Sequence, residues 1–329
     1  MEQFKIALTG ASGFVGSHIA EQLVHQGHSL TCLLRASSKM DYLENLDIIK
    51  IIGDINKPDS LKEFAEDQDI VIHAAGRTKA RHESEYILAN TIGTKNLLEA
   101  VSQFNPGIKR FIFISSQAAV GPTPTDEPLD ETAKLNPITA YGRSKAGAEE
   151  ICEEFMDQTP ITIIRPPTVY GPRDKDVFNY FRLINRGVQP IVGEENMLSV
   201  VSVQNLVHGV LLATQASGQK LQCFFVTDDG HYTWAHFAGM IATALNKRPV
   251  KVKIPFWLVD LVARIAETHG KLTGRPTLFN REKILEMKQP RWTVKNDKAK
   301  QELGYEPIVT TQEGIEGTAN WYIDNRWLK

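Results

Sequence analysis

A tyrosine and a lysine four positions apart are the first candidates for chemistry in this chain. Tyr141 and Lys145 follow a pair of hydroxyl residues, Ser115 and Ser116. A separation of four residues places two side chains on one face of a helix. A free tyrosine has a pKa near ~10 and is a poor acid or base at neutral pH, but a neighbouring ammonium favours the phenolate and lowers that pKa. The pair therefore predicts proton transfer, although Tyr and Lys at this spacing are common and, alone, usually structural.

A glycine pattern near the N-terminus predicts a loop that can bind the phosphates of a ligand. Gly10, Gly13 and Gly16 follow the apolar run 6–8 and precede an amphipathic helix. Gly10 can take the backbone angles of a tight turn, Gly13 lets the main chain approach a pyrophosphate, and Gly16 lets the helix lie close to the strand. The helix N-terminus then offers free N–H groups to an anion. The stretch predicts a dinucleotide site; the alternative is a glycine turn with no ligand.

The end of the second apolar run bears on which dinucleotide binds. An NAD site has a carboxylate there for the ribose 2′-hydroxyl, whereas a 2′-phosphate needs a cation. No acid occurs between Arg35 and Asp41, and Ser37, Ser38 and Lys39 lie between them. Arg35 can pair with a 2′-phosphate and the serines can donate to it. NADP is favoured over NAD, unless Arg35 and Lys39 are only solvated loop charges.

Two further residues at strand ends are ambiguous. Asp54, after the third run, could lie beside an adenine amino group or cap the helix expected after Pro58. His73 ends the fourth run, and we expect it to be a structural neighbour rather than an acid or base.

These residues require a sheet that brings strand ends together. Continuous apolar runs alternate with helical patterns, which indicates an α/β fold with a doubly wound parallel sheet covered on both faces, a Rossmann arrangement. We expect a dinucleotide-binding domain from 1–168 and about 204–228, and a smaller, mainly C-terminal substrate domain from about 169–203 and 229–329. The runs are Ile6–Leu8, Leu30–Leu34, Ile48–Ile52, Ile70–Ala74, Phe111–Ser115, Ile161–Ile164 and Phe224–Val226.

Composition excludes several classes of protein. The 329 residues are 42% hydrophobic and 23% charged with a net charge of −2, so we expect no nucleic-acid partner. Cys32, Cys152 and Cys223 form no metal or disulfide motif. A strand begins within the first residues and no apolar stretch reaches the ~18 to 20 residues that span a bilayer. We expect a cytoplasmic protein without a metal.

Taken together, the motifs resemble the extended short-chain dehydrogenase/reductase family, which includes NAD-dependent epimerases and dehydratases. The resemblance covers nearly the whole chain. It implies that Tyr141 is the acid/base, that Lys145 holds the nicotinamide ribose and lowers the pKa of Tyr141, and that Ser116 binds the substrate oxygen. The segments that carry it are Thr9–Gly16, His73–Ala75, Asn90–Leu97, Ser115–Ser116, Tyr141 with Lys145, and Arg165–Arg173.

The resemblance also implies the remaining site residues. Asn90 would lie on the fourth helix near the active site, or would only bond to the backbone. The implied cofactor contacts are Gly10, Ser12, Gly13, Phe14, Val15, Gly16, Arg35, Ser38, Lys39, Asp54, Ile55, Ala74, Ala75, Gly76, Ser115, Tyr141, Lys145, Pro167, Thr168 and Val169.

The branch of the family decides the substrate. Sugar-nucleotide members resemble one another in an arginine that grips the diphosphate, and Leu198 stands at that place, after Glu194 and Glu195. The region 200–208 and Arg35 instead resemble the dihydroflavonol reductase and 3β-hydroxysteroid dehydrogenase branch. We therefore expect an NAD(P)-dependent oxidoreductase that reduces a ketone or oxidises a secondary alcohol on an apolar small molecule. The alternatives are a nucleotide-sugar epimerase or dehydratase and a non-catalytic dinucleotide sensor.

The segment 255–266 is an apolar helix of about three turns. We expect it to pack into the core of the smaller domain. The alternatives are that it lines a lipophilic pocket, rests on a membrane surface or meets a partner. The sequence does not determine the oligomeric state, and a homodimer is one alternative.

Overall fold

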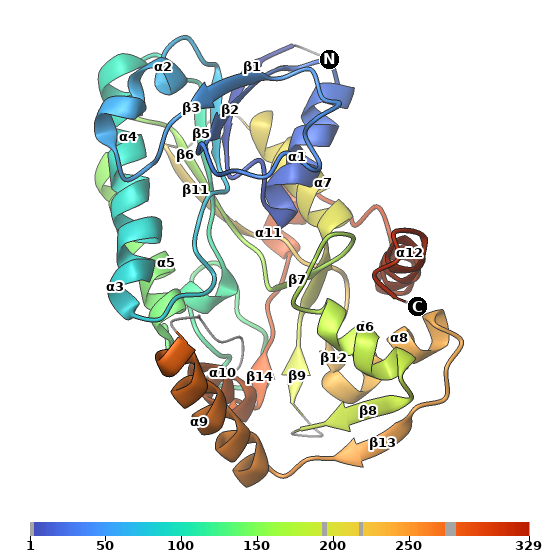
Figure 1. The fold of residues 1–329 in the computed structure, drawn as a ribbon. Helices are drawn as coiled ribbons and strands as arrows, with labels where there is room; N and C mark the ends of the chain where they lie inside the picture. The colour runs from blue at the N-terminus through green and yellow to red at the C-terminus, as the bar shows by residue number, and fades with distance from the viewer. Residues whose placement is uncertain (1–2, 193–195, 217–219, 274–280, 329) are drawn as a thin grey trace.

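A seven-stranded parallel sheet forms the centre of the larger part of the molecule (Figure 1). The computed structural model describes residues 3–192, 196–216, 220–273 and 281–328. The strand order is β11-β6-β5-β4-β1-β2-β3. The chain adds β2 and β3 on one side of β1 and then, from β4 onward, adds strands on the other side, as expected for a doubly wound fold. The strands are β1 (Lys5–Thr9), β2 (Ser29–Leu34), β3 (Ile49–Ile52), β4 (Ile70–His73), β5 (Arg110–Ile114), β6 (Ile161–Arg165) and β11 (Leu221–Phe225).

The apolar runs become strands because both faces of the sheet are buried. Ile6 of β1 pairs with Leu30 on one side and Ile70 on the other, and all three side chains are buried. Alternate residues of these strands enter two separate hydrophobic clusters, one on each face. The predicted fold class is confirmed.

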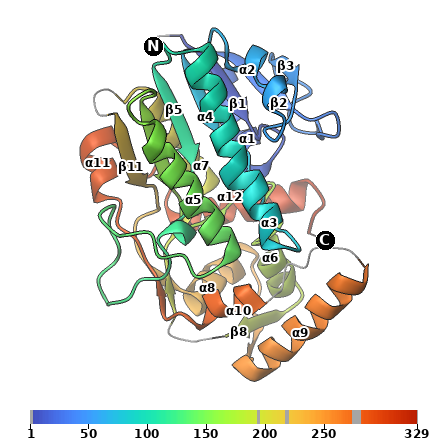
Figure 2. The ribbon, with the colours of Figure 1, turned by 90° about the vertical axis from the view of Figure 1, so that its left-hand side faces the viewer.

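Helices cover the two faces of the sheet, with α2, α4 and α5 on one side and α1, α7 and α11 on the other (Figure 1). Figure 2 shows α4 and α5 lying side by side in front of the sheet. The elements of these layers and their connections are α1 (Phe14–His25), η1 (Pro58–Ser60), α2 (Lys62–Ala65), α3 (Glu83–Tyr86), η2 (Ile87–Ile92), α4 (Gly93–Phe104), η3 (Gln117–Ala119), α5 (Ala140–Phe155), α7 (Val203–Thr214) and α11 (Asp297–Leu303).

Among the described residues, three small sheets and five helices lie beyond the carboxyl edge of the large sheet (Figure 1). Most of them share a core of aromatic and aliphatic side chains that includes Tyr170, Phe237 and Tyr322. The domain limits given above remain a prediction. The elements are β7 (Thr168–Tyr170), α6 (Phe178–Asn185), β8 (Val188–Ile191), β9 (Met197–Leu198), β10 (Val200–Ser202), β12 (Tyr232–Thr233), α8 (Trp234–Ala244), β13 (Val250–Lys253), α9 (Phe256–Thr273), α10 (Arg281–Lys288), β14 (Arg291–Trp292) and α12 (Thr311–Asp324).

Helix α9 corrects the expectation for 255–266. Over residues 256–265, the part of the helix whose side chains the structure describes, one side packs, through Val259 and Ala263 against Ile284 of α10. The opposite side exposes large apolar side chains, among them Trp257, which is 68% exposed. The prediction of a helix buried in its own core was therefore wrong for that side, because α10 is too small to cover more than one face. No helix in the described ranges is long and apolar enough to cross a membrane.

Candidate active site

The glycine loop between β1 and α1 has the backbone geometry of a phosphate cradle. Gly10 has a φ of +76°, a conformation that side chains disfavour. A Cβ on Gly16 would lie 2.1 Å from the Gly10 carbonyl oxygen, so only glycine allows α1 to approach β1 this closely. Gly13 is extended and caps α1 without a side-chain bond, which leaves the first helical N–H groups facing outward. These features fit the pyrophosphate of a dinucleotide.

His73 joins this loop to the neighbouring elements through a directed chain of hydrogen bonds. The Thr94 hydroxyl donates to the Asn90 carbonyl, so His73 Nε2 must donate to Thr94, over 3.1 Å. His73 Nδ1 then accepts from the Thr9 hydroxyl at 2.7 Å, and Thr9 Oγ1 in turn accepts from the Ala75 amide. Burial, together with the charge of Lys145, lowers the pKa of His73 to about 3. The histidine is a neutral structural bridge, as expected.

We expect His73→Gln to flatten the acid dependence of stability. Because the pKa of His73 is lowered in the folded state, only the unfolded chain binds this proton between about pH 6.5 and 3. The stability of the folded state that depends on a neutral His73 is fully present above pH 6.5 and is lost as pH falls below it. Denaturant titrations should show that the wild type loses roughly 2 kcal/mol more than the variant between pH 6.5 and 5. The matched control is His25→Gln, whose ring is exposed; equal slopes for wild type and His73→Gln would contradict the assignment.

The loop after β2 presents the cations that we expect at a 2′-phosphate. Arg35 and Lys39 are exposed, and neither forms an ion pair within the described part of the chain. Ser38 Oγ accepts a hydrogen bond from the Arg35 amide at 3.0 Å, which shapes the loop, and a hydroxyl that accepts one bond can still donate its proton.

Asp54 takes part in a turn. Its Oδ1 accepts from the Asn56 amide at 2.9 Å. It does not cap the helix after Pro58, where the cap residue is Lys57 and no side-chain bond is made. The adenine contact remains a prediction. Ile55 packs against the sheet core, and its carbonyl accepts from Asn96.

Tyr141 lies in the first turn of α5 and is directed to the end of β5. Thr139 caps this helix by accepting from the Gly142 amide. The Tyr141 phenol faces the Ser116 side chain, which acts on its pKa, and its ring meets that of Tyr86 edge to face at 6.2 Å. Ser116 itself accepts from the Ala118 amide, which fixes its hydroxyl at the start of η3.

Burial raises the pKa of Tyr141 to about 12, and the Ser116 side chain opposes this rise. Lys145 is not among the groups that set this pKa, and the lowering that we expect from the Lys145 ammonium together with the positive nicotinamide stays a prediction. The phenol therefore keeps its proton at neutral pH.

Lys145 is held at the end of β5 by its own contacts. Nζ donates to the Ile114 carbonyl at 2.7 Å and lies 4.6 Å from the centroid of the Phe113 ring. Burial lowers the pKa of Lys145 to about 8, while the Glu149 carboxylate opposes the change. Gly76 lies close enough that a Cβ there would be 3.5 Å from this ammonium.

A buried ion pair behind the lysine was not predicted. Glu149 and Arg165 are almost fully buried and joined by bonds of 2.6 and 3.1 Å. Ser115, for which a cofactor contact stays a prediction, donates its hydroxyl to Glu149. Glu149 follows Tyr141 and Lys145 on the same face of α5, and this spacing could have revealed it.

Asn90 positions two elements of the site. In the π-helical turn η2, its Oδ1 accepts from the Arg77 amide at 2.7 Å, and its Nδ2 donates to the Arg77 carbonyl and to Ser144 Oγ. It therefore fixes the loop after β4 against α5. The expected bonding to backbone is present, and the role near the active site stays a prediction.

The remaining predicted residues lie at the same carboxyl edge. Pro167, Thr168 and Val169 lead from β6 into β7. Ala74 and Ala75 touch the glycine loop, since a Cβ on Gly10 would lie 2.6 Å from the Ala75 amide nitrogen. Ser12, Phe14 and Val15 form the loop and the first turn of α1, and the last two pack against its core.

Leu198, where an arginine would mark a sugar-nucleotide site, is 3% exposed in β9. It packs in the core of the smaller sheets rather than presenting a charge. Glu194 and Glu195 lie outside the described residues.

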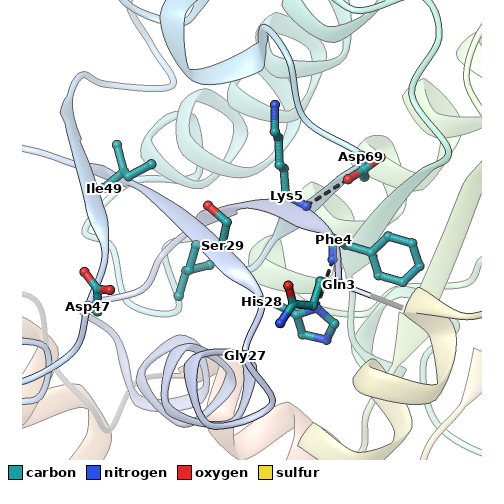
Figure 3. Close-up of a pocket in the computed structure, with 10 residues that line it drawn as sticks. Gln3, Phe4, Lys5, Gly27, His28, Ser29, Asp47, Ile49 and Asp69 are labelled. Carbon is teal, nitrogen blue, oxygen red and sulfur yellow. Dashed lines mark hydrogen bonds between the residues drawn. The ribbon is translucent and has the colours of Figure 1, made fainter. Parts of the chain in front are cut away.

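A hollow of about 560 Å³ lies at the opposite edge of the sheet (Figure 3). It is lined by the amino ends of β1 and β2, and two of its polar side chains bond to the backbone, with Asp69 accepting from the Lys5 amide and His28 from the Phe4 amide. It is separated from Tyr141 by the length of the sheet, so it does not contribute to this site.

Comparisons with known proteins agree with this geometry. The model of the NAD dependent epimerase/dehydratase family matches residues 6–220. A ceramide reductase from Caulobacter vibrioides is 25% identical over 98% of this chain and 96% of its own length. A UDP-glucose 4-epimerase from Vibrio cholerae is 29% identical over 97% and 95%. The solved UDP-glucose 4-epimerase of Thermotoga maritima has the same fold, with a TM-score of 0.80 at 23% identity over 98% of this chain and 99% of its own.

Proposed function

Because the chain belongs to the NAD dependent epimerase/dehydratase family, we propose that it is an NADP-dependent oxidoreductase acting on an apolar ketone or the corresponding secondary alcohol. The observation that carries this proposal is Leu198, an apolar residue packed in the core where sugar-nucleotide members resemble one another in an arginine. A diphosphate needs cations, and a leucine supplies none. The similarity to a ceramide reductase, whose name indicates a lipid substrate, supports the same choice.

The protonation state of Tyr141 favours the reducing direction. A phenol whose pKa is raised to about 12 carries its proton at neutral pH and can give it to an oxygen that gains negative charge. Ser116, whose side chain acts on the pKa of the phenol, would hold that same oxygen. When bound, the nicotinamide supplies the hydride.

Lys145 and the glycine loop hold the cofactor in this proposal. The Lys145 ammonium, anchored on the Ile114 carbonyl, would contact the nicotinamide ribose, and the N-terminus of α1 would meet the pyrophosphate. Arg35 and Lys39 would meet the 2′-phosphate of NADP.

A screen that follows NADPH absorbance tests the function. Long-chain acyl ketones, steroids and flavonoids form the first arm, and UDP-sugars form the second. Net NADPH consumption with an apolar ketone is expected. Conversion of a UDP-sugar without net consumption would select the second candidate, an epimerase or dehydratase, which the similarity to the Vibrio cholerae enzyme favours. Dinucleotide binding without turnover in either arm would select a sensor, although such a protein has no need for Ser116, Tyr141 and Lys145 together.

We expect Arg35→Glu to reverse the cofactor preference. Loss of a charged hydrogen bond to the 2′-phosphate costs roughly 1.5–3 kcal/mol, or about 10- to 150-fold in affinity. Titration of protein fluorescence should show that NADPH affinity falls by this factor while NADH affinity changes little. Lys134→Glu, an exposed lysine elsewhere, is the matched control. A preference for NADH in the wild type would refute the NADP assignment and leave the rest of the proposal intact.

A further inference from the structure

The unpacked side of α9 is an apolar surface made by one helix. Trp257, Leu258, Leu261, Val262 and Ile265 are between 37% and 68% exposed. At about 100° per residue they fall within an arc of roughly 140°, and the packed residues Val259 and Ala263 lie opposite. We call these five residues the α9 face. Exposed apolar patches of this kind mark binding surfaces.

Cations gather in the chain directly before the α9 face. Lys247 and Arg248 precede β13, and Lys251 and Lys253 lie in it; all four are exposed. The stretch 247–259 contains no carboxylate. Asp260, the first acid on the helix, is paired with Arg264 at 2.7 Å. Lys247, Arg248 and Lys251 therefore supply positive charge in the segment just before the apolar face, in a chain whose net charge is −2.

The position of these elements leaves them accessible. Figure 1 places β13 and α9 along the lower edge of the molecule, and in Figure 2, after rotation about the vertical, α9 projects from the same edge. A tryptophan on an exposed helix with neighbouring lysines is typical of helices that lie in the interface of a bilayer.

We propose that the α9 face docks on the surface of an anionic lipid bilayer. The apolar side chains would enter the acyl boundary, and the cations of 247–253 would meet the lipid phosphates. A second copy of the chain is a poorer occupant, because a symmetric contact places the same surface on both sides and brings the like charges together.

Docking would place lipid near the catalytic helix. Glu282 of α10, the helix that packs under α9, accepts a hydrogen bond from the Ala140 amide at 2.7 Å, next to Tyr141. The inference does not depend on the proposed reaction, and its test uses no substrate.

Vesicle sedimentation with the full chain tests the docking. An equimolar mixture of phosphatidylcholine and phosphatidylglycerol should bind the protein about tenfold better than phosphatidylcholine alone. Trp257→Ser with Ile265→Ser should remove most binding, and Lys251→Glu should weaken it on the anionic vesicles only. The matched control is Ile323→Ser in α12, which replaces an isoleucine that is 50% exposed.

Two outcomes would overturn the proposal. One is equal sedimentation of the wild type and the Trp257→Ser, Ile265→Ser variant. The other is a dimer in light scattering that this variant dissociates, which would assign the α9 face to a second copy. Quenching of tryptophan emission by brominated lipid, present in the wild type and lost in Trp257→Phe, is the expected independent result.

Discussion

Replacing Tyr141 by phenylalanine is expected to lower turnover about 10²- to 10⁴-fold, the usual contribution of a positioned general acid. The change removes one oxygen and keeps the ring against Tyr86, so the fold and the glycine loop are left in place. The measurement is kcat with the substrate found in the NADPH screen, together with the Kd of NADPH by fluorescence titration. Turnover should fall while NADPH affinity stays within about twofold.

Tyr86→Phe is the control for this substitution. Tyr86 is a buried neighbour whose hydroxyl donates a long bond of 3.4 Å to the Thr78 carbonyl, so its loss should change turnover by less than about tenfold. Tyr141→Phe with nearly normal turnover would refute the role of Tyr141. Equal losses in both variants would indicate that packing between the rings, rather than proton transfer, matters.

The sheet and the glycine loop could be predicted because their signals are local. A buried parallel strand needs a continuous apolar run, and the seven predicted runs all overlap strands of the sheet. Gly10 and Gly16 were identified because a left-handed turn and a close helix–strand contact both exclude a side chain. Each of these structural requirements determines the residue type at one position or along one short segment, so it can be recognised in the sequence.

The electrostatics of the site could not be predicted because they depend on burial. A tyrosine beside a lysine suggested a lowered pKa, but desolvation of the Tyr141 phenol outweighs the contacts that oppose it. The lysine instead faces the Ile114 carbonyl and Glu149. Similarly, the apolar pattern of α9 was visible, but whether a partner element covers each side depends on residues far away in the sequence.

Glu149→Leu is expected to lower the free energy of unfolding by about 3–5 kcal/mol, because it leaves the buried Arg165 guanidinium without its counter-charge. Arg165 Nη1 already has no hydrogen-bond partner among the described residues, so the remaining nitrogens depend on the carboxylate. Urea denaturation monitored by circular dichroism measures the change. The control is Glu154→Leu, an exposed glutamate on the same helix, for which a change below about 0.5 kcal/mol is expected.

The double variant Glu149→Leu, Arg165→Met separates the structural role of the pair from its effect on Lys145. Replacing both partners by apolar side chains should restore stability to within about 1–2 kcal/mol of the wild type. It should not restore the charge that supports the Lys145 ammonium, so the pKa of Lys145 should fall further below about 8 and the alkaline loss of turnover should begin at lower pH. A double variant that is stable and keeps the wild-type pH profile would mean that Glu149 serves the fold alone. A shifted profile would make Glu149 a positioning residue that acts through Lys145. Both side chains extend from α5 to the end of β5, where Lys145 contacts Ile114 and Glu149 contacts Ser115.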